Sequence, residues 1–326
     1  MRRREFMAGF GLAGAWSIAA RAQQSIRPLI GYLTPQSSEV DASYLNAFKK
    51  GLEQAGYTDG QNVSIKYLSA DGRFDRLSAL AANLVREHVA VIVASSGTIT
   101  ALAAKGATST IPIVFVTGGD PIKAGLVASL NRPGANLTGV NVIAGALNAK
   151  RLEVLHEVMS SVTTVGIMQN NNNPNADPEL KEMQSAAQKL GIRLFVRDAS
   201  TPSEIGDAFA EIVKQGAGAL VVGTDPFLNT RVDQLVKMTR DAHLPAIYGF
   251  REFPAAGGLI SYGTSATEAR RQAGIYTARI LNGEIPADLP VIRSTKIELV
   301  FNLRTAKALG ISVPLSLLGR ADEVIE

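Results

Sequence analysis

The chain has 326 residues, is 46% hydrophobic and 19% charged, and contains no cysteine. These values exclude a disulfide-stapled small protein, a thiolate metal site and a cysteine nucleophile, and the length favours two lobes over a single core. The formal net charge is +4, but residues 1–22 carry +3 of it, so the remainder offers no polycation for nucleic acid.

Residues 1–22 have the layout of an export signal peptide. Three arginines at positions 2–4 open the chain, an apolar run occupies 7–20, and Ala20-Arg21-Ala22 forms a small-x-small cleavage site. The run is too short to span a bilayer as a helix. The twin-arginine route and general secretion both stay open. Because no cysteine stands at the cleavage point, we expect a protein that is cleaved near Ala22, is not a lipoprotein and is free in the periplasm.

From residue 27 onward, apolar runs alternate with amphipathic stretches of helical period. In the first half of the chain we expect strands at 29–33, 63–67, 89–94, 113–116 and 137–143. The helices between them are expected at 45–55, 77–85 and 98–107. The first of these helices is followed by Gly56, at the position where a helix end favours glycine.

The second half of the chain repeats the alternation. We expect strands at 165–168, 194–196, 219–222, 246–248 and 259–262, and helices at 152–159, 180–190, 203–215 and 230–241. A helix at 267–281 and a strand at 297–301 follow. This order predicts an α/β fold with two doubly wound parallel-sheet lobes joined by crossing strands.

The lobes are expected to share the chain unevenly. After the signal peptide at 1–22, the first lobe takes residues 27–139 plus about 264–292. The second lobe takes 140–263 plus about 293–326. No Pro/Gly/Ser-rich linker separates the halves, so we expect them to be closely connected.

Motifs that carry catalysis or hold a cofactor do not stand out. The three histidines, His88, His156 and His243, lie far apart on or beside helices. Nucleophile-elbow, metalloprotease and P-loop patterns are missing. We therefore expect no metal, no cofactor and no catalytic residues.

Candidate ligand-binding residues stand after the expected strands, because an open parallel sheet binds ligands beyond the carboxyl ends of its strands. Hydroxyl groups and helix N-termini suit a carboxylate, Asp225 suits an ammonium group, and aromatic rings suit stacking. The first lobe offers Thr34, Ser96, Thr98 and Thr117. The second lobe offers Asn170, Asn171, Asp225, Phe227, Tyr248 and Phe250.

Each candidate also has a purely structural interpretation. Ser96 and Thr98 suit the cap of the helix that follows them, and Asp225 before Pro226 has the pattern of a helix start. The asparagine run at 170–173 is also typical of an ordinary loop. The aromatic candidates equally suit a hydrophobic core. These alternatives stay open at the level of sequence.

Several segments between residues 29 and 325 resemble the ABC-transporter substrate-binding protein family that includes tryptophan- and tyrosine-type importers. The resemblance is carried by Ile30-Gly31-Tyr32-Leu33, Arg132-Pro133-Gly134-Ala135-Asn136-Leu137-Thr138-Gly139, Ala256-Gly257-Gly258-Leu259-Ile260-Ser261-Tyr262-Gly263 and Asn302-Leu303-Arg304-Thr305-Ala306-Lys307-Ala308-Leu309-Gly310. It implies a type I periplasmic-binding fold and no catalysis.

The resemblance further implies a function for the protein. It would be a monomeric receptor that delivers a small amino-acid-like, aromatic solute to an inner-membrane ABC permease. By position, the solute would meet Thr34, Ser96, Thr98, Asn171, Asp225 and Tyr248. Two other functions stay open, an exported α/β enzyme and the ligand-sensing domain of a signalling system.

Overall fold

The first sheet takes its strands from both ends of the described chain. The computed structural model describes residues 27–142 and 147–326, so the expected signal peptide and its cleavage site lie outside the described residues. The strand order is β11-β5-β4-β3-β1-β2, and the pairs are parallel. These strands are β1 (Leu29–Thr34), β2 (Ser64–Ser69), β3 (Val91–Ala94), β4 (Ile113–Thr117), β5 (Leu137–Val142) and β11 (Ile292–Ser294).

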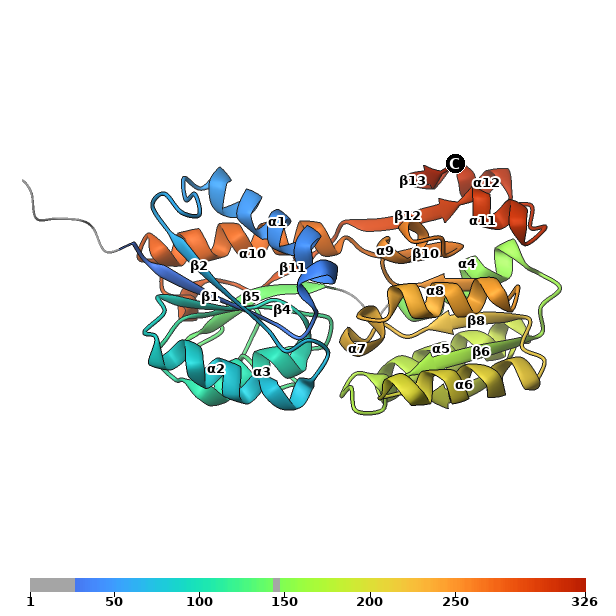
Figure 1. Ribbon diagram of the computed structural model, residues 1–326, viewed down its shortest axis with the longest axis horizontal. Coiled ribbons are helices and arrows are strands. Elements are labelled where there is room, and N and C mark those ends of the chain that lie inside the picture. The colour runs from blue at the N-terminus through green and yellow to red at the C-terminus, as the bar shows by residue number, and fades with distance from the viewer. Residues whose placement is uncertain (1–26, 143–146) are drawn as a thin grey trace, which may run out of the picture.

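Helices cover both faces of this sheet, as Figure 1 shows. On one face, α1 (Ser38–Gln54) and α10 (Ala266–Leu281) bury apolar side chains against β1, with Phe48 packed near Tyr32 at a ring-centroid distance of 5.3 Å. On the other face lie α2 (Leu77–Arg86) and α3 (Gly97–Ala107). Each of these amphipathic helices turns its apolar stripe toward the sheet and its polar side toward solvent, which explains this layering.

The helices α1 and α10 cross at very close range, although they come from opposite ends of the chain. A Cβ atom added at Gly51 would lie 1.9 Å from the carbonyl oxygen of Arg271, and one added at Gly274 would lie 2.2 Å from the carbonyl oxygen of Phe48. No side chain fits in either place, so glycine is required at both positions. The crossing fixes α10, and with it the residues that α10 presents to the second lobe.

The second sheet has the strand order β13-β12-β10-β9-β8-β6-β7. Its pairs are parallel except that β12 runs antiparallel to β10. Its strands are β6 (Thr164–Gln169), β7 (Arg193–Asp198), β8 (Ala219–Val222), β9 (Ala246–Tyr248), β10 (Ile260–Thr264), β12 (Ile297–Asn302) and β13 (Glu323–Ile325).

The helices of the second lobe also cover both faces of their sheet. The cluster on one face includes α4 (Asn148–Val158) and α5 (Ala176–Leu190), and the cluster on the other includes α6 (Pro202–Lys214) and α8 (Val232–Asp241). Short helices complete the lobe at α7 (Pro226–Asn229), α9 (Glu252–Ala255), α11 (Leu303–Ala308) and α12 (Leu315–Leu318). Single 3-10 turns in the first lobe lie at Phe74–Arg76 and Pro286–Asp288.

The expected fold of two α/β lobes joined by crossing segments is confirmed, with one difference in the second sheet. There the final strands return beside β10, and the returning β12 runs antiparallel. The chain leaves the first sheet after Val142 and after Ser294, and it leaves the second after Thr264. We propose these strand ends as the lobe boundaries, slightly later along the chain than 139, 263 and 292. Among the described residues, no helix is long and apolar enough to cross a bilayer.

Candidate functional site

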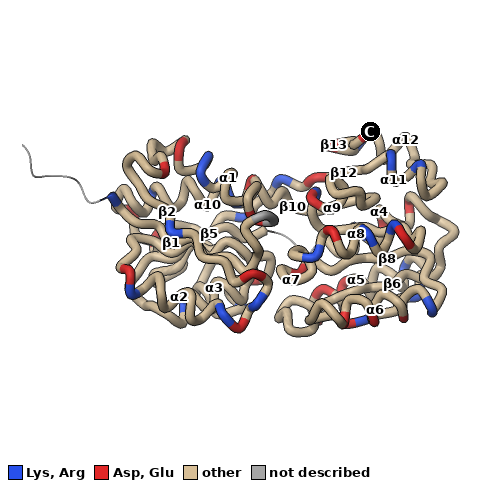
Figure 2. The backbone as a smooth tube through the Cα atoms, in the orientation of Figure 1, with Lys and Arg blue, Asp and Glu red and all other residues tan. Residues whose placement is uncertain are grey.

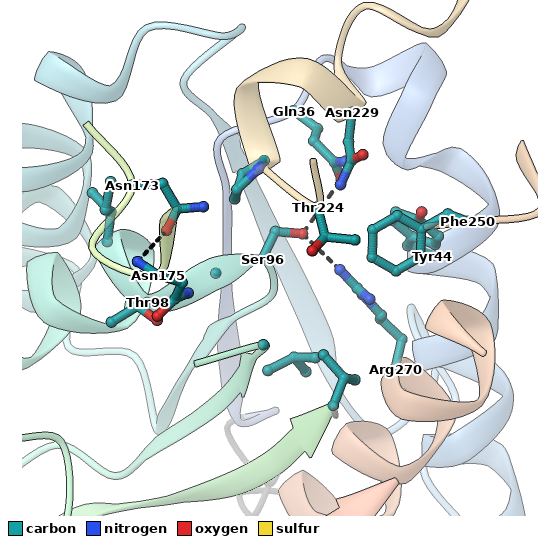
Figure 3. A pocket seen from close by; sticks show the side chains of 16 residues that line it. Gln36, Tyr44, Ser96, Thr98, Asn173, Asn175, Thr224, Asn229, Phe250 and Arg270 are labelled. Atoms are coloured by element: carbon teal, nitrogen blue, oxygen red, sulfur yellow. Dashed lines mark hydrogen bonds between the residues drawn. The ribbon is translucent and has the colours of Figure 1, made fainter. Parts of the chain in front are cut away.

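The strands of both sheets end at the cleft between the lobes, and the residues that follow them line a cavity there (Figure 3). The cavity holds about 50 Å³ of water-accessible space and adjoins a second one of about 480 Å³, with which it shares Gly118, Val142 and Asn175. The first lobe contributes Gln36, Tyr44, Ser96 and Thr98, and α10 contributes Arg270. The second lobe contributes Asn173, Asn175, Thr224, Asn229 and Phe250.

Arg270 is the one charged side chain among the described residues that line this smaller cavity. Its side chain is 6% exposed, and the guanidinium carbon lies 4.2 Å from the centre of the Tyr44 ring. One terminal nitrogen, Nη2, donates to Ser96 Oγ at 2.7 Å, and Nη1 donates to the carbonyl oxygen of Ala266 at 3.2 Å. The Nε atom is buried and has no hydrogen-bond partner among the described residues. A guanidinium group carries five N–H donors, so capacity for a further acceptor remains.

The N-terminus of α3 points to the same place. Ser96 is the cap residue of this helix, but its hydroxyl does not cap the helix. Instead, Ser96 Oγ accepts from Arg270 and donates to Gln36 Oε1 at 3.4 Å. The first N–H groups of a helix have no partner within the helix, and the helix dipole favours an anion at this end. The helix end and Arg270 together form a positive site at the cleft.

The second lobe presents neutral side chains that are held from behind by buried acids. Asn173 Nδ2 donates to Asp225 at 2.9 Å, and Thr224 Oγ1 donates to Glu179 at 3.1 Å. Burial raises the pKa of both Asp225 and Glu179, and the hydrogen bonds from these neighbours act in the opposite direction. Asn173 Oδ1 also accepts from the backbone N–H of Asn175 at 3.0 Å. The amide and hydroxyl groups at the cleft are therefore fixed in direction.

A buried acid also lies behind the lining of the first lobe. Burial raises the pKa of Asp41 to about 7, although the Arg270 cation and the hydrogen bond from Thr34 oppose that shift. Its Oδ2 atom has no hydrogen-bond partner among the described residues. On the opposite lobe, Glu252 lies beside the Tyr44 phenol, and burial raises the pKa of this carboxyl as well.

Of the residues expected at the site, Ser96, Thr98 and Phe250 line the cavity. Thr98 Oγ1 and Thr117 Oγ1 are 2.7 Å apart, so Thr117 supports the lining without being part of it. Thr34 is buried and donates to Asp41. The four hydroxyl residues that were expected in the first lobe thus lie in the cavity lining or are buried near it.

The remaining expected residues lie outside the cavity lining. Asp225 caps α7, where its carboxylate accepts from the backbone N–H of Leu228 at 3.0 Å and from Asn170 at 3.1 Å. Asn171 is exposed, and its oxygen accepts from a neighbouring glutamine. Phe227 is packed in the core of the second lobe. Tyr248 is fully buried, with its ring stacked on a phenylalanine at 4.3 Å.

Sequence reasoning missed several residues that line the cavity. Tyr44 and Arg270 lie within helices, where a strand-end rule does not look. Asn173 and Asn175 lie a few residues beyond Asn170 and Asn171, which the sequence analysis selected. The loop between the end of β6 at Gln169 and the start of α5 at Ala176 is long enough to place these later asparagines at the cleft. Among the described residues, no group of three or more metal-binding side chains lies together.

Two α/β lobes that enclose a polar cavity at their strand ends define the class of two-lobed solute-binding proteins. The chain belongs to the ABC transporter substrate-binding protein family, whose model matches residues 38–325. This is a family of binding proteins and not of enzymes. Its members are typically located outside the cytoplasm and deliver a small solute to a membrane permease.

One curated protein and two solved structures are similar to this chain. A tyrosine-binding protein of Clostridioides difficile (strain R20291) is 28% identical over 80% of this chain and 75% of its own length. The structure of an ABC domain from Streptococcus pneumoniae in complex with L-Trp is 24% identical, has a TM-score of 0.83, and covers 92% of this chain and 100% of its own. A ligand-free, open structure of a substrate-binding protein with adhesive properties from Clostridium difficile is 25% identical, has a TM-score of 0.66, and covers 92% and 99%.

Proposed function

We propose that the protein is the periplasmic receptor of an ABC importer and that it binds an amino-acid-like solute, with an aromatic side chain as the leading class. The observation that carries this proposal is that Arg270 of α10 is buried and donates a hydrogen bond to Ser96 at the N-terminus of α3. Arg270 and this helix end together form a site for a carboxylate in the cleft. The similar tyrosine-binding protein and the L-Trp complex support the solute class. We further propose that the leader is cleaved near Ala22 and that the receptor is a monomer that catalyses nothing.

Different lining residues contact different parts of the solute. The solute carboxylate lies at Arg270, Ser96 and the first N–H groups of α3, because charge-assisted hydrogen bonds are the strongest available there. Tyr44 and Phe250 supply aromatic surface from opposite lobes. A carboxylate held by Arg270 and the helix end, together with one buried ring, is consistent with a micromolar dissociation constant, which corresponds to about 8 kcal/mol.

The arrangement of the lobes supports a closed form. Each comparison covers 92% of this chain, and the TM-score is 0.83 with the L-Trp complex and 0.66 with the ligand-free, open structure. The sequence identities are nearly equal, 24% and 25%, and we infer that the two scores differ because of the angle between the lobes. Binding shifts such a receptor toward the closed form, since only the solute contacts both faces of the cleft.

A thermal-shift screen tests the solute class. L-tryptophan, L-tyrosine, L-phenylalanine, glucose and adenosine are each added to the purified protein. We expect an aromatic amino acid to raise Tm, because a ligand at a hundred times its Kd adds about 2.7 kcal/mol to stability. A shift with glucose or adenosine and none with the amino acids would contradict the proposal.

A further inference from the structure

The charges around the smaller cavity are one-sided, and this bears on which solutes it accepts. Arg270 is the charged residue among the described lining, while Gln36, Asn173, Asn175, Thr224 and Asn229 are neutral. Figure 3 shows these side chains around the cavity, with the Arg270 guanidinium directed toward Ser96. A free amino acid carries a carboxylate and an ammonium group, so only one of its two charges meets an opposite charge in this lining.

Four buried acids lie near the smaller cavity without lining it, and one of them, Glu179, lines the adjoining larger cavity. Asp225 accepts from Asn173, and Glu179 accepts from Thr224. Asp41 accepts from Thr34 on the far side of the lining, and Glu252 lies beside the Tyr44 phenol. None of these four described carboxyl groups belongs to the lining of the smaller cavity.

The adjoining larger cavity does contain acidic residues, which are Asp120, Glu179 and Glu182. None of these acids lines the smaller cavity, where Arg270 lies. The ammonium nitrogen of an amino acid is held about 2.5 Å from its carboxylate carbon by two covalent bonds. A solute whose carboxylate binds Arg270 therefore keeps its ammonium group in the smaller cavity, whose described lining holds no acidic residue.

We propose that the carboxylate is the charged group by which this receptor recognises its solute, so that the 2-hydroxy acid counterparts of amino acids bind as well as the amino acids themselves. This inference rests on the proposed function and narrows it. An ammonium group that loses its water shell without an opposite charge is costly to bury, whereas a hydroxyl group is satisfied by amide and hydroxyl neighbours. The receptor thus serves carboxylates with or without an amino group.

Isothermal titration with matched compounds tests this inference. The pairs are L-tryptophan with indole-3-lactate and L-tyrosine with 4-hydroxyphenyllactate, and tryptamine and tyramine provide the amino group without the carboxylate. We expect each hydroxy acid to bind tighter than its amino acid or less than tenfold weaker, and the amines to bind at least a hundredfold weaker. A hydroxy acid that binds tenfold or more weaker than its amino acid, or an amine that binds as well as the acids, would overturn the inference.

Substitutions on α10 supply the matched control. Arg270→Met is expected to weaken binding of the amino acid and of the hydroxy acid by the same factor, at least about thirtyfold, because both lose the same buried charge contact. Arg271→Met removes the same charge one position along, where the side chain pairs with Glu268 and Gln54, and is expected to leave binding unchanged. Unequal losses in Arg270→Met contradict the inference. Failure of every acid and amino acid to bind the unmodified protein removes the proposed function as well.

Discussion

Asp41 is a buried carboxyl group beside the Arg270 cation, and its titration affects the stability of the folded chain. Its pKa is raised from 3.8 to about 7, mainly by burial. Between these two pH values the folded protein holds a proton that the unfolded chain releases. Stability from this group is therefore present at low pH and is lost as pH rises through about 7, by on the order of 1 kcal/mol per pH unit.

The variant Asp41→Asn isolates this contribution, because its side chain stays uncharged and its carbonyl oxygen still accepts from Thr34. Urea unfolding midpoints are measured for both proteins from pH 5 to pH 8. We expect the unmodified protein to lose stability across this range faster than the variant does. Parallel curves would show that the Asp41 proton is not linked to folding.

The candidate site was only partly predictable, for reasons visible in individual residues. Ser96 and Thr98 follow a short, fully apolar strand, so their place at the cleft could be read from the chain. Arg270 lies on a helix 174 residues away from Ser96, and only the folded structure brings the two together. Asp225 has the signature of a ligand-binding acid and of a helix cap. In the structure, Asp225 accepts hydrogen bonds from Asn170, from Asn173 and from the backbone N–H of Leu228. The local sequence does not show whether the partners of such an acid come from the protein or from a ligand.

At the scale of elements, the crossing of α1 and α10 depends on the absence of side chains at Gly51 and Gly274. The variant Gly274→Ala places a methyl group 2.2 Å from a backbone carbonyl oxygen. We expect it to lower the free energy of unfolding by about 1–3 kcal/mol, because the helices must separate. Gly206, in the interior of α6, has open space around it, so Gly206→Ala is expected to stabilise by about 0.5–1 kcal/mol. Chemical denaturation of both variants would reject the interpretation if the two effects had the same sign.

The same scale shows where sequence patterns work. Long apolar or amphipathic segments such as β1 and α6 carry enough residues to show their period, and the structure has them where the pattern predicts. The edge strands β11 and β13 have three residues each, too few for a period to show. Pairing direction is also set by tertiary packing, so the antiparallel contact of β12 with β10 could not be predicted from the strand itself.

At the scale of the whole molecule, Gly97 of the first lobe lies against Pro226 of the second, a contact that belongs to the closed form we propose. A Cβ atom at Gly97 would lie 2.7 Å from Cγ of the proline ring. The variant Gly97→Ala is therefore expected to oppose the closed form and to weaken solute binding by about tenfold. Titration calorimetry with the amino acid that gives the largest thermal shift measures this loss.

The control for this variant is Gly134→Ala. Both glycines have a φ angle of +82°, so both variants carry the same backbone strain, about 1–2 kcal/mol. Gly134 has only ordinary van der Waals neighbours at 3.8 Å, and these come from its own lobe. An equal loss of affinity in the two variants would assign the effect to strain and not to closure.

The backbone tube in Figure 2 runs through both lobes. Because α10 returns to the first lobe late in the chain, that lobe can fold completely only after α10 has been synthesised. Gln54 at the end of α1 accepts a hydrogen bond from Arg271 of α10, 217 residues further along. At about 5–20 residues per second, synthesis of that interval takes roughly 10–40 s. During this interval, Phe48 and Leu52 of α1 lack the contacts with α10 that bury them in the folded protein. The half that leaves the ribosome first therefore cannot complete its lobe until α10 has been made, and until then the nascent chain exposes the apolar face of α1.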